Sequence, residues 1–510
     1  MAQNGCKCVP FLTTPPAMAA ERVGRLAAQM NLERVIAALA PTDVVHRAPV
    51  EISDLAYDTR AAGAGALFFC VPGERHDGHR FARDAVQQGA AALVVERVLE
   101  LDVTQVVVPD ARRAMAQAAV VFFGEPTREL EIAGVTGTNG KTTTTFLLHS
   151  ILAAAGRRPG LLGTIESRIG GNRRAAIRTT PEAIDLQRAF REMLDAGDRS
   201  CALEATSHGS ELGRLDGVCF AALAFTNLGQ EHLDFHGTFE RYFAAKRRLF
   251  VEGERPPAAI NVGDEHGRRL ADDLRALGHE PLLTFGWVEE ADIRPEQLEL
   301  DGNGARLRAG GVELRTRLRG RFNVENVLTA VAVARLLGIE DDAIAAGVEA
   351  LEGVPGRFEA VESGQPFAVI VDYSHKPDAL ENVLRTAREL ASDRVICVFG
   401  CGGDRDRAKR PMMGRIAGEL ADVAIVTSDN PRSEDPDAII AEIVSGTAVS
   451  LAVEPDRAAA IERAIGIAHE GDVVVIAGKG HEQGQEFADR TIPFDDREVA
   501  REALQAVARA

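Results

Sequence analysis

The 510-residue sequence lacks any apolar run close to the roughly twenty residues that are needed to cross a bilayer. It also lacks a long basic tract, and its formal net charge of −18 argues against general nucleic-acid binding. The first residues show neither the charged start nor the apolar stretch and cleavage site of a secretion signal. These absences exclude a membrane-spanning protein and disfavour a nucleic-acid-binding one. With 45% hydrophobic and 26% charged residues, the chain has the composition of a globular protein.

Cysteine is scarce, with seven residues spread over the whole chain. An odd, widely spaced set does not form the framework of a disulfide-rich secreted domain. Cys201, Cys219 and Cys397 lie within apolar, strand-like runs, where a free thiol behaves as a small hydrophobic side chain. This distribution suits a reducing compartment, and we therefore expect a cytoplasmic protein.

A chain of this length is too long for one hydrophobic core and predicts about three domains. Residues 1–29 show no sustained periodicity and are expected to form a disordered tail, whereas an amphipathic helical pattern runs from Met30 to Pro41. Alternating strand-like and helical stretches predict a small α/β domain at 30–128. A central α/β domain is expected at 129–353, and a hinge near Gly353 leads to a third α/β domain at 354–510.

The strongest motif lies between Leu130 and Gly156, where an apolar strand, the turn GTNGKTT and a helical pattern follow one another. The glycines of such a turn let backbone amides approach phosphate oxygens. Lys141 can reach the β- and γ-phosphates, and Thr142 can hold Mg²⁺. The longer form of the motif requires glycine at Val135, so only the short GxxGKT form is present. Together with its flanking elements it predicts ATP binding.

Polar residues follow the next strands of the central domain. Glu204 ends the buried strand that begins at Ser200, the position at which phosphate-binding proteins of this type hold magnesium. His232, Asp234 and His236 follow the strand 221–225, and the pattern leaves a metal-linked role and a structural role equally open.

Two later helical stretches carry candidates whose ordinary interpretation is structural. Lys246 lies on the helix that Thr238 is expected to cap, and the pattern alone predicts a solvated lysine. Asn323 and Asn326 lie near the start of a buried helix at 320–339, where an amide could bind a purine edge but most often caps the helix.

The third domain has four apolar strands separated by helices, the pattern of an open parallel sheet. Ligand-binding residues lie at the carboxyl ends of such strands. At those ends the sequence places four polar loops, namely DYSHKPDAL from Asp372, GCGGDRDRAKRP from Gly400, SDNPR from Ser428 and GKGHE from Gly478.

Together with LEATSHGSELGR, TNLGQEHLDFHGT, YFAAK and PGRFE, these motifs make the chain resemble the Mur ligase family from about Met30 to the C-terminus. The resemblance is strongest to the members that add meso-diaminopimelate during peptidoglycan synthesis. It therefore implies a role in cell-wall biogenesis, cell shape and cell division. It implies an α/β fold of three domains: a small N-terminal UDP-binding domain, a central P-loop ATPase-like domain with a parallel sheet, and a C-terminal Rossmann-like domain that binds the amino acid. DYSHKPDAL departs from the more usual DYAHTPDAL at Ser374 and Lys376.

By position, the resemblance implies four groups of site residues. The ATP-binding group is Gly137, Thr138, Asn139, Gly140, Lys141, Thr142, Thr143, Asn323, Arg357 and Asp372. The group for the UDP-linked substrate is Thr59, Glu74, Arg75, His76, Arg178, Thr179, Thr180, Thr206 and Arg214. The amino-acid-binding group is Arg405, Asp429, Asn430, Pro431, Arg432, Gly478 and Glu482. The catalytic group is Lys141, Glu204, His232 and Lys246, with Mg²⁺ held by Thr142, Glu204, His232 and Lys246 as a carbamate.

The implied reaction joins meso-diaminopimelate to the D-glutamate of UDP-N-acetylmuramoyl-L-alanyl-D-glutamate through an acyl phosphate, with ATP as co-substrate and the protein expected to act as a monomer. Three alternatives stay open: a ligase that adds L-lysine, a folylpolyglutamate synthetase, and a nucleotide-binding regulatory or scaffold protein descended from a ligase. The DNPR loop and the loops near Thr59 disfavour the first two. The presence of Lys141, Glu204, Lys246 and Arg432 disfavours the third.

Overall fold

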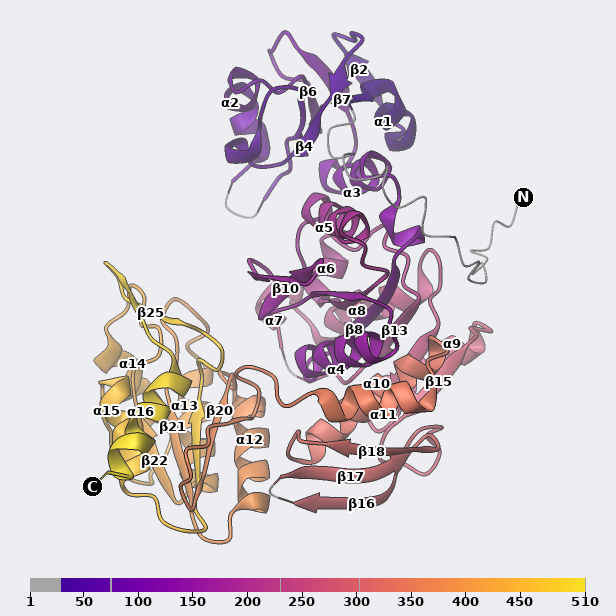
Figure 1. Cartoon of the computed structure of the whole chain (residues 1–510). Coiled ribbons are helices and arrows are strands. Elements are labelled where there is room, and N and C mark those ends of the chain that lie inside the picture. The colour runs from indigo at the N-terminus through magenta and orange to yellow at the C-terminus, as the bar shows by residue number, and fades with distance from the viewer. Residues whose placement is uncertain (1–28, 74–75, 230, 302, 510) are drawn as a thin grey trace.

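The fold is given by a computed structural model, which describes residues 29–73, 76–229, 231–301 and 303–509. Three sheet-centred domains follow one another along the chain and form an open arc, with the central domain between the other two (Figure 1). The residues of the expected N-terminal tail, apart from Gln29, lie outside the described part. Among the described helices, none has the length and apolar character that crossing a bilayer requires. The exact domain limits remain a prediction.

The N-terminal domain contains a five-stranded sheet in the order β2-β7-β6-β5-β4, in which only β2 runs antiparallel to its neighbour. Helices α1 and α3 cover one face, where Leu32, Val35 and Met115 pack against Phe69 and Val94. The elements are β1 (Met30–Asn31), α1 (Leu32–Leu39), β2 (Asp43–Val45), β3 (Glu51–Ile52), β4 (Asp54–Ala56), η3 (Thr59–Ala61), β5 (Ala66–Phe69), η4 (Gly78–Phe81), α2 (Ala82–Gln87), β6 (Ala92–Val95), β7 (Thr104–Val107) and α3 (Ala111–Phe122).

The central domain contains an eight-stranded sheet in the order β11-β10-β9-β12-β8-β13-β14-β15, parallel except for the hairpin β10–β11. Its first half comprises η5 (Pro126–Arg128), β8 (Glu131–Thr136), α4 (Lys141–Ala154), β9 (Pro159–Leu162), β10 (Glu166–Ile169), β11 (Asn172–Ala175), α5 (Ala183–Ala196), β12 (Ser200–Glu204), α6 (Ser207–Glu211) and β13 (Ala222–Phe225). Its second half comprises α7 (Leu233–His236), α8 (Phe239–Val251), β14 (Ala258–Asn261), α9 (Glu265–Ala276), β15 (Leu282–Phe285), α10 (Arg321–Leu336) and α11 (Asp341–Ala350).

Side chains alternate between the two faces of β8, as they do in any strand. Ala133 and Val135 join the core beneath α4, α10 and α11, while Ile132 joins the core beneath α5 and α8. Val135, where the longer phosphate-binding motif has glycine, is therefore a fully buried core residue. Because β8 is central and its neighbours are β12 and β13, the loops that follow these three strands meet at one edge.

An additional three-stranded antiparallel sheet, which the sequence patterns did not reveal, packs on the same core as α10. Its strands are β16 (Pro295–Asp301), β17 (Gly304–Ala309) and β18 (Val312–Thr316). Leu307 and Leu314 bury its inner face, whereas the outer face is charged.

The C-terminal domain contains a six-stranded sheet in the order β19-β20-β24-β21-β22-β23, parallel from β20 onward as predicted. Helices α12, α13 and α14 cover one face, and α15 and α16 cover the other. The elements are β19 (Glu359–Ala360), β20 (Ala368–Asp372), α12 (Pro377–Leu390), β21 (Val395–Phe399), α13 (Lys409–Leu420), β22 (Val423–Val426), α14 (Pro436–Val444), β23 (Ala452–Val453), α15 (Arg457–Gly466), β24 (Val473–Ala477), β25 (Gly484–Glu486), β26 (Thr491–Pro493) and α16 (Asp496–Val507).

Candidate active site

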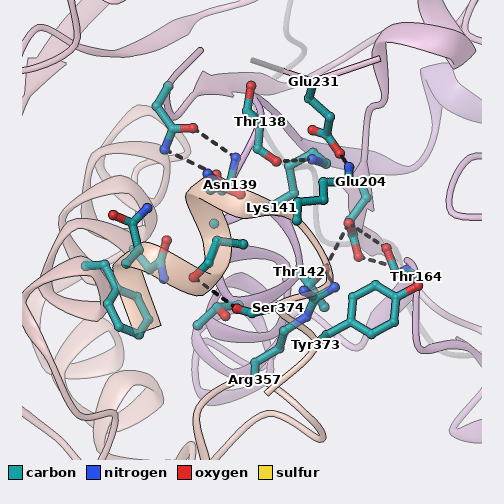
Figure 2. A pocket seen from close by; sticks show the side chains of 18 of the residues that line it. Thr138, Asn139, Lys141, Thr142, Thr164, Glu204, Glu231, Arg357, Tyr373 and Ser374 are labelled. Atoms are coloured by element: carbon teal, nitrogen blue, oxygen red, sulfur yellow. Dashed lines mark hydrogen bonds and ion pairs between the residues drawn. The ribbon is translucent and has the colours of Figure 1, made fainter. Parts of the chain in front are cut away.

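A cavity of about 350 Å³ lies between the central and C-terminal domains, where the turn after β8 faces the loop after β20 (Figure 2). The central domain contributes its phosphate-binding turn, its two neighbouring loops and α10, and the C-terminal domain contributes residues 372–383 together with Arg357. Of the residues singled out in the sequence, it brings together Thr138, Asn139, Gly140, Lys141, Thr142, Thr143, Thr179, Glu204, Thr206, His232, Lys246, Arg357 and Asp372.

The turn before α4 has the backbone shape that a phosphate site requires. Gly140 precedes the helix at φ +86°, a left-handed conformation that favours glycine. A Cβ there would lie 2.3 Å from the Asn326 side-chain oxygen, so any other residue would also displace this side chain of α10. The Lys141 Nζ donates to the carbonyl oxygens of Gly137 and Thr138 at 3.0 and 2.7 Å. Burial lowers the pKa of Lys141 to about 8, and the Arg357 guanidinium acts in the same direction.

Glu204 lies at the end of β12 and is completely buried. Its carboxylate accepts hydrogen bonds from the Thr142 hydroxyl at 3.1 Å, and from the Thr164 backbone N–H and hydroxyl at 2.8 and 3.0 Å. Figure 2 shows the carboxylate fixed between these two threonines. A carboxylate and a hydroxyl therefore share one small region beside the phosphate-binding turn, an arrangement of hard oxygen donors.

Lys246 is buried on α8, with 1% of its surface exposed, so the pattern-based expectation of a solvated lysine is wrong. The helix presents this residue to the underside of the phosphate-binding turn, where its Nζ donates to the Gly137 carbonyl oxygen at 2.7 Å and lies 4.6 Å from the centre of the Tyr242 ring. Burial, with a contribution from Lys141, lowers the pKa of Lys246 well below its usual value. A buried amine in its neutral form is a nucleophile.

The three residues at His232, Asp234 and His236 do not converge on one point. His232 lines the cavity with a backbone φ of +55°, and its Nε2 lies 3.2 Å from Glu231 Oε1. His236 points away and lies 3.0 Å from the Ser207 hydroxyl, while Asp234 is exposed. Burial lowers the pKa of His232 to about 4, with Lys141 and Lys246 acting in the same direction. Within the described residues, no group of three or more His, Cys, Asp or Glu side chains forms a metal site.

Helix α10 is capped by Gly320 rather than by an asparagine side chain, so the default interpretation of Asn323 and Asn326 as caps is not met. Asn323 is buried and donates to the Arg319 carbonyl oxygen at 2.8 Å. Of these two asparagines, Asn326 lines the cavity, and Asn323 Oδ1 accepts a hydrogen bond from its Nδ2 at 2.9 Å. The structure thus places Asn323 behind the cavity wall and Asn326 in it.

The C-terminal domain supplies the opposite wall of the cavity. Arg357 donates to the Thr142 hydroxyl at 3.3 Å and lies over the Tyr373 ring at 4.8 Å, and its Nε is buried without a hydrogen-bond partner among the described residues (Figure 2). Asp372 accepts from the Phe358 backbone N–H at 2.7 Å and from the Ser374 hydroxyl. Burial raises the pKa of Asp372.

Thr179, Thr180, Thr206 and Arg214 form a continuous wall that leads away from Glu204. The Thr180 hydroxyl donates to the Glu204 carbonyl oxygen at 2.8 Å and accepts from the Thr206 hydroxyl at 2.9 Å. The Arg214 guanidinium donates to the Thr180 carbonyl oxygen at 3.2 Å. The wall thus extends from Glu204 toward α5.

Beyond this wall, a second cavity of about 490 Å³ opens between the N-terminal and central domains and is lined by Arg178. Thr59 does not line it, although Asp58 and Arg60 on either side do. His76 is exposed beside Phe81, away from this lining. Glu74 and Arg75 lie outside the described residues.

The loops after β22 and β24 form a third polar group, joined by a lysine that the sequence reading did not select. Lys479 is completely buried, and its Nζ donates to Asn430 Oδ1 at 2.8 Å and to Glu482 Oε2 at 3.2 Å. Asn430 donates to the same Glu482 oxygen at 2.8 Å, and Asp429 Oδ1 is 4.0 Å from the ammonium. Lys479 belongs to the GKGHE loop, which the sequence places among the predicted ligand-binding loops. This position is the signal that could have identified it.

Glycine and proline shape the surroundings of this group. Gly478 has a φ of +121°, and a Cβ on it would lie 2.5 Å from Asp429 Oδ2. Pro431 is buried between Asn430 and Arg432. Arg432 lies at φ +52°, an uncommon conformation for a residue other than glycine.

Arg432 and Arg405 flank Gly402, as a Cβ on this glycine would be 3.0 Å from Arg432 Nη1 and 3.9 Å from Arg405 Cγ. Arg432 donates to the Gly403 carbonyl oxygen at 2.9 Å, and Arg405 is exposed. Asp435, three residues after Arg432, caps α14 by accepting a hydrogen bond from the Asp437 N–H. The two guanidinium groups therefore border one polar region at the C-terminal end of the sheet.

The comparisons with protein families agree with this three-part arrangement. Residues 51–134 match the Mur ligase family catalytic domain, residues 135–334 match the Mur ligase middle domain, and residues 356–480 match the Mur ligase glutamate ligase domain.

Individual relatives are similar over nearly the whole chain. A UDP-N-acetylmuramoyl-L-alanyl-D-glutamate–2,6-diaminopimelate ligase from Solibacter usitatus is 47% identical over 90% of this chain and 94% of its own. A ligase of the same name from Geobacillus kaustophilus is 45% identical over 93% of this chain and 99% of its own. A solved structure of a ligase with the same name has a TM-score of 0.69 and 32% identity, and covers 94% of this chain and 100% of its own. The fold is also that of the MurF ligase from Thermotoga maritima in complex with ADP. That structure has a TM-score of 0.58 and 20% identity, and covers 90% of this chain and 98% of its own.

Proposed function

The chain belongs to the Mur ligase family, and on that premise we propose that it is the ATP-dependent ligase that joins meso-diaminopimelate to UDP-N-acetylmuramoyl-L-alanyl-D-glutamate. The observation that carries this proposal is the convergence of Lys141, Glu204 and Arg357 in one cavity between two domains. Relatives that carry the name of this ligase align along nearly their whole length. The free cysteines among the described residues favour a cytoplasmic location, and we expect a monomer.

ATP binds in the cavity between the central and C-terminal domains. The amides of residues 137–143 and the Lys141 ammonium hold its phosphates, since the start of α4 presents unpaired N–H groups. Asn326, with Asn323 supporting it from behind, contacts the base. Arg357 and Asp372 approach the nucleotide from the C-terminal domain, and the unpartnered Arg357 Nε is a donor available for a phosphate or ribose oxygen.

The residues present fit a magnesium ion. The Thr142 hydroxyl and the Glu204 carboxylate are adjacent oxygen donors, and Mg²⁺ takes such ligands together with phosphate oxygens and water. Bound Mg²⁺ would neutralise charge on the transferred phosphoryl group. His232 and a carbamate on Lys246 complete the proposed ligand set.

The proposed carbamate follows from the position of Lys246. A buried ammonium without a carboxylate partner is unfavourable, and a neutral amine can react with carbon dioxide. The amine nitrogen forms a bond to the carbon of carbon dioxide and loses one proton. The product is a carboxylate one atom beyond the original nitrogen, directed at the phosphate-binding turn. This modification converts an unfavourable cation into an oxygen donor for a metal.

The UDP-linked substrate lies across the second cavity, with its nucleotide toward Thr59, Glu74, Arg75 and His76 and its peptide along Arg178, Thr179, Thr180, Thr206 and Arg214. This path leads from the N-terminal domain to Glu204. The D-glutamyl carboxylate attacks the γ-phosphorus, the bond from that phosphorus to the bridging oxygen breaks, and ADP departs. Lys141 stabilises the charge that develops on the phosphoryl oxygens.

The amino acid binds at the loops after β22 and β24. Asp429, Asn430, Glu482 and the backbone at Gly478 and Pro431 contact its amino and carboxylate groups, and Arg405 and Arg432 contact the distal carboxylate. The amine attacks the acyl phosphate carbon, and the tetrahedral intermediate collapses to an amide, releasing phosphate and a proton. The domains must approach closely enough to join amine and acyl phosphate, so the segment near Gly353 acts as the hinge.

The decisive experiment measures phosphate release by the purified protein with ATP, Mg²⁺, the UDP-linked dipeptide and one amino acid at a time. We expect turnover with meso-diaminopimelate that requires all three substrates. Turnover with L-lysine at an equal rate would overturn the amino-acid assignment alone. Absence of turnover with every amino acid would overturn the proposed ligase activity.

A further inference from the structure

Lysine is rare in this protein, since only six of its 58 basic Lys and Arg residues are lysines. Five of the six lie in the described residues, and none of these five is exposed. Lys141 and Lys246 meet at the phosphate-binding turn, and Lys479 joins the amino-acid loops. The exposed positive charges of the described residues are therefore arginines. We therefore expect each enclosed lysine of the described residues to have a specific structural or chemical role.

Lys376 is an enclosed lysine that has no role in the proposed mechanism. It stands just before α12 in the C-terminal domain, and its Nζ forms an ion pair with Glu231 Oε1 across the ATP-binding cavity. Glu231 belongs to the loop after β13 in the central domain, 145 residues away in sequence. The side chains are only 27% and 12% exposed, respectively. This ion pair joins opposite walls of the cavity.

Further contacts continue from the pair into the phosphate-binding turn. Glu231 Oε2 accepts from the Tyr242 hydroxyl at 3.4 Å, and that hydroxyl lies 2.9 Å from Thr138 Oγ1. The Thr138 hydroxyl in turn accepts from the Gly229 N–H at 2.9 Å. On the other side, Asp378 approaches Gly229 closely enough for a Cβ there to lie 3.4 Å from its Oδ2. The start of α12 thus packs on the loop that borders the phosphate site.

The surroundings make the partner of Lys376 important. Burial lowers the pKa of Lys376 to about 7, Lys141 and Lys409 act in the same direction, and Asp378 opposes them. A half-buried cation that faces another cation is unfavourable unless a carboxylate compensates for it. Glu231 supplies that carboxylate from the other domain, so separating the domains would leave Lys376 without this counter-charge.

We propose that Lys376 is a positioning residue that locks the C-terminal domain onto the ATP-binding cavity through Glu231. Tyr373, three residues earlier, has its ring 5.0 Å from that of His481 in the loop that holds Lys479 and Glu482. The lock therefore fixes the distance between the phosphate site and the amino-acid loops. The predicted effect on kcat rests on the proposed function. The ion pair that joins the two domains does not depend on it.

The test uses the full-length variants Lys376→Gln, Glu231→Gln, the double neutral variant and the charge-swapped pair Lys376→Glu with Glu231→Lys. Arg385→Gln is the matched control, because Arg385 forms an exposed ion pair with Glu381 within α12, inside one domain and outside the cavity lining. Four quantities are measured: the radius of gyration by small-angle X-ray scattering, the affinity for a non-hydrolysable ATP analogue, and kcat and KM for the amino acid.

We expect each neutral variant to increase the radius of gyration and to lower kcat by roughly ten- to a hundredfold, because one buried charge loses its partner. The double variant should be no worse than either single variant, and the charge swap should recover part of kcat and of the compact shape. The affinity for the ATP analogue should change less than kcat.

A different result would overturn the lock. If Lys376→Gln weakened binding of the ATP analogue strongly while Glu231→Gln changed neither shape nor kcat, Lys376 would be a direct phosphate ligand. Additive losses in the double variant, or unchanged scattering in all variants, would also refute it. Because scattering and nucleotide affinity need no turnover, these outcomes are distinct from failure of the unmodified protein to use diaminopimelate.

Discussion

Arg432 Nε lies 2.7 Å from Glu486 Oε2, so the guanidinium proposed to bind the distal carboxylate of the amino acid is held by a carboxylate of the chain itself. Glu486 ends β25 and is 51% exposed at its side chain, whereas Arg432 is 24% exposed. The pair fixes the fork of the guanidinium at the rim of the amino-acid loops. A ligand carboxylate can use the remaining N–H groups or replace the exposed glutamate.

Replacing Arg432 should therefore affect the amino acid far more than ATP. For Arg432→Lys or Arg432→Ala we expect kcat/KM for meso-diaminopimelate to fall by roughly ten- to a hundredfold, the cost of one unpaired charged group. KM for ATP should stay nearly constant. Arg490→Ala is the matched control, because Arg490 is an exposed arginine beside the same hairpin and pairs with Asp489. Equal losses for both substrates would contradict the assignment of Arg432.

Glu204→Gln should abolish most turnover while preserving the fold. The amide keeps the shape of the side chain but loses the charge that we assign to magnesium, and such losses cost about two to three orders of magnitude. Steady-state phosphate release over a magnesium series measures the effect, and thermal unfolding checks the fold. Near-normal turnover at saturating magnesium would show that Glu204 has another role.

Lys246→Ala should be nearly inactive, because it removes the carbamate. Acetate or formate should restore part of the rate by supplying a small carboxylate at the same place. Arg247→Ala is the control, since the adjacent residue on α8 forms a half-exposed ion pair with Asp273 instead. Full activity of Lys246→Ala in buffer depleted of carbon dioxide would falsify the carbamate.

Lys479→Met should raise KM for the amino acid and lower the free energy of unfolding by about 1–3 kcal/mol, because Asn430 and Glu482 lose a buried donor. KM for ATP should change little. Arg415→Met replaces an exposed basic residue in the same domain and serves as the control. An unchanged KM for the amino acid in Lys479→Met would mean that this lysine only stabilises the fold.

Acid should destabilise the protein through one buried and four half-buried histidines. Burial lowers the pKa values of His149, His232, His236, His375 and His481 to about 4, while an unfolded histidine titrates near 6.5. Between these values the unfolded chain binds protons that the folded protein does not bind. The free energy of unfolding should therefore fall as the pH decreases from 6.5 to 4, a trend that urea unfolding at several pH values measures. A constant free energy over that range would contradict the burial of these rings.

The sequence predicted the three α/β domains because strand and helix periodicities are local. It also located Lys141 and Glu204, since a phosphate-binding turn and the end of the next buried strand have a fixed relationship in the sheet. Both residues line the cavity. The sheet of β16, β17 and β18 was missed because its alternating charges resemble a polar loop.

Other features depend on contacts between distant segments. The period of α8 could not show that Lys246 is buried, because the phosphate-binding turn that covers it is about a hundred residues earlier. The same limitation applies to Asn326, which becomes the cavity residue only through the packing of α10 beside Gly140. Neither the pairing of Lys376 with Glu231 nor that of Arg432 with Glu486 leaves a local pattern.

Because the described lysines are enclosed, their reaction with amine-modifying reagents reports on the sites that they border. On most proteins a reagent that acylates primary amines reacts first with many exposed lysines and reports little about function. Here the described surface offers arginine instead, and the reactive amines of that part of the chain border the sites. Toward the described part of the chain, cyanate and active esters become site-directed reagents, and protection of individual lysines there by each substrate maps its place along the reaction path.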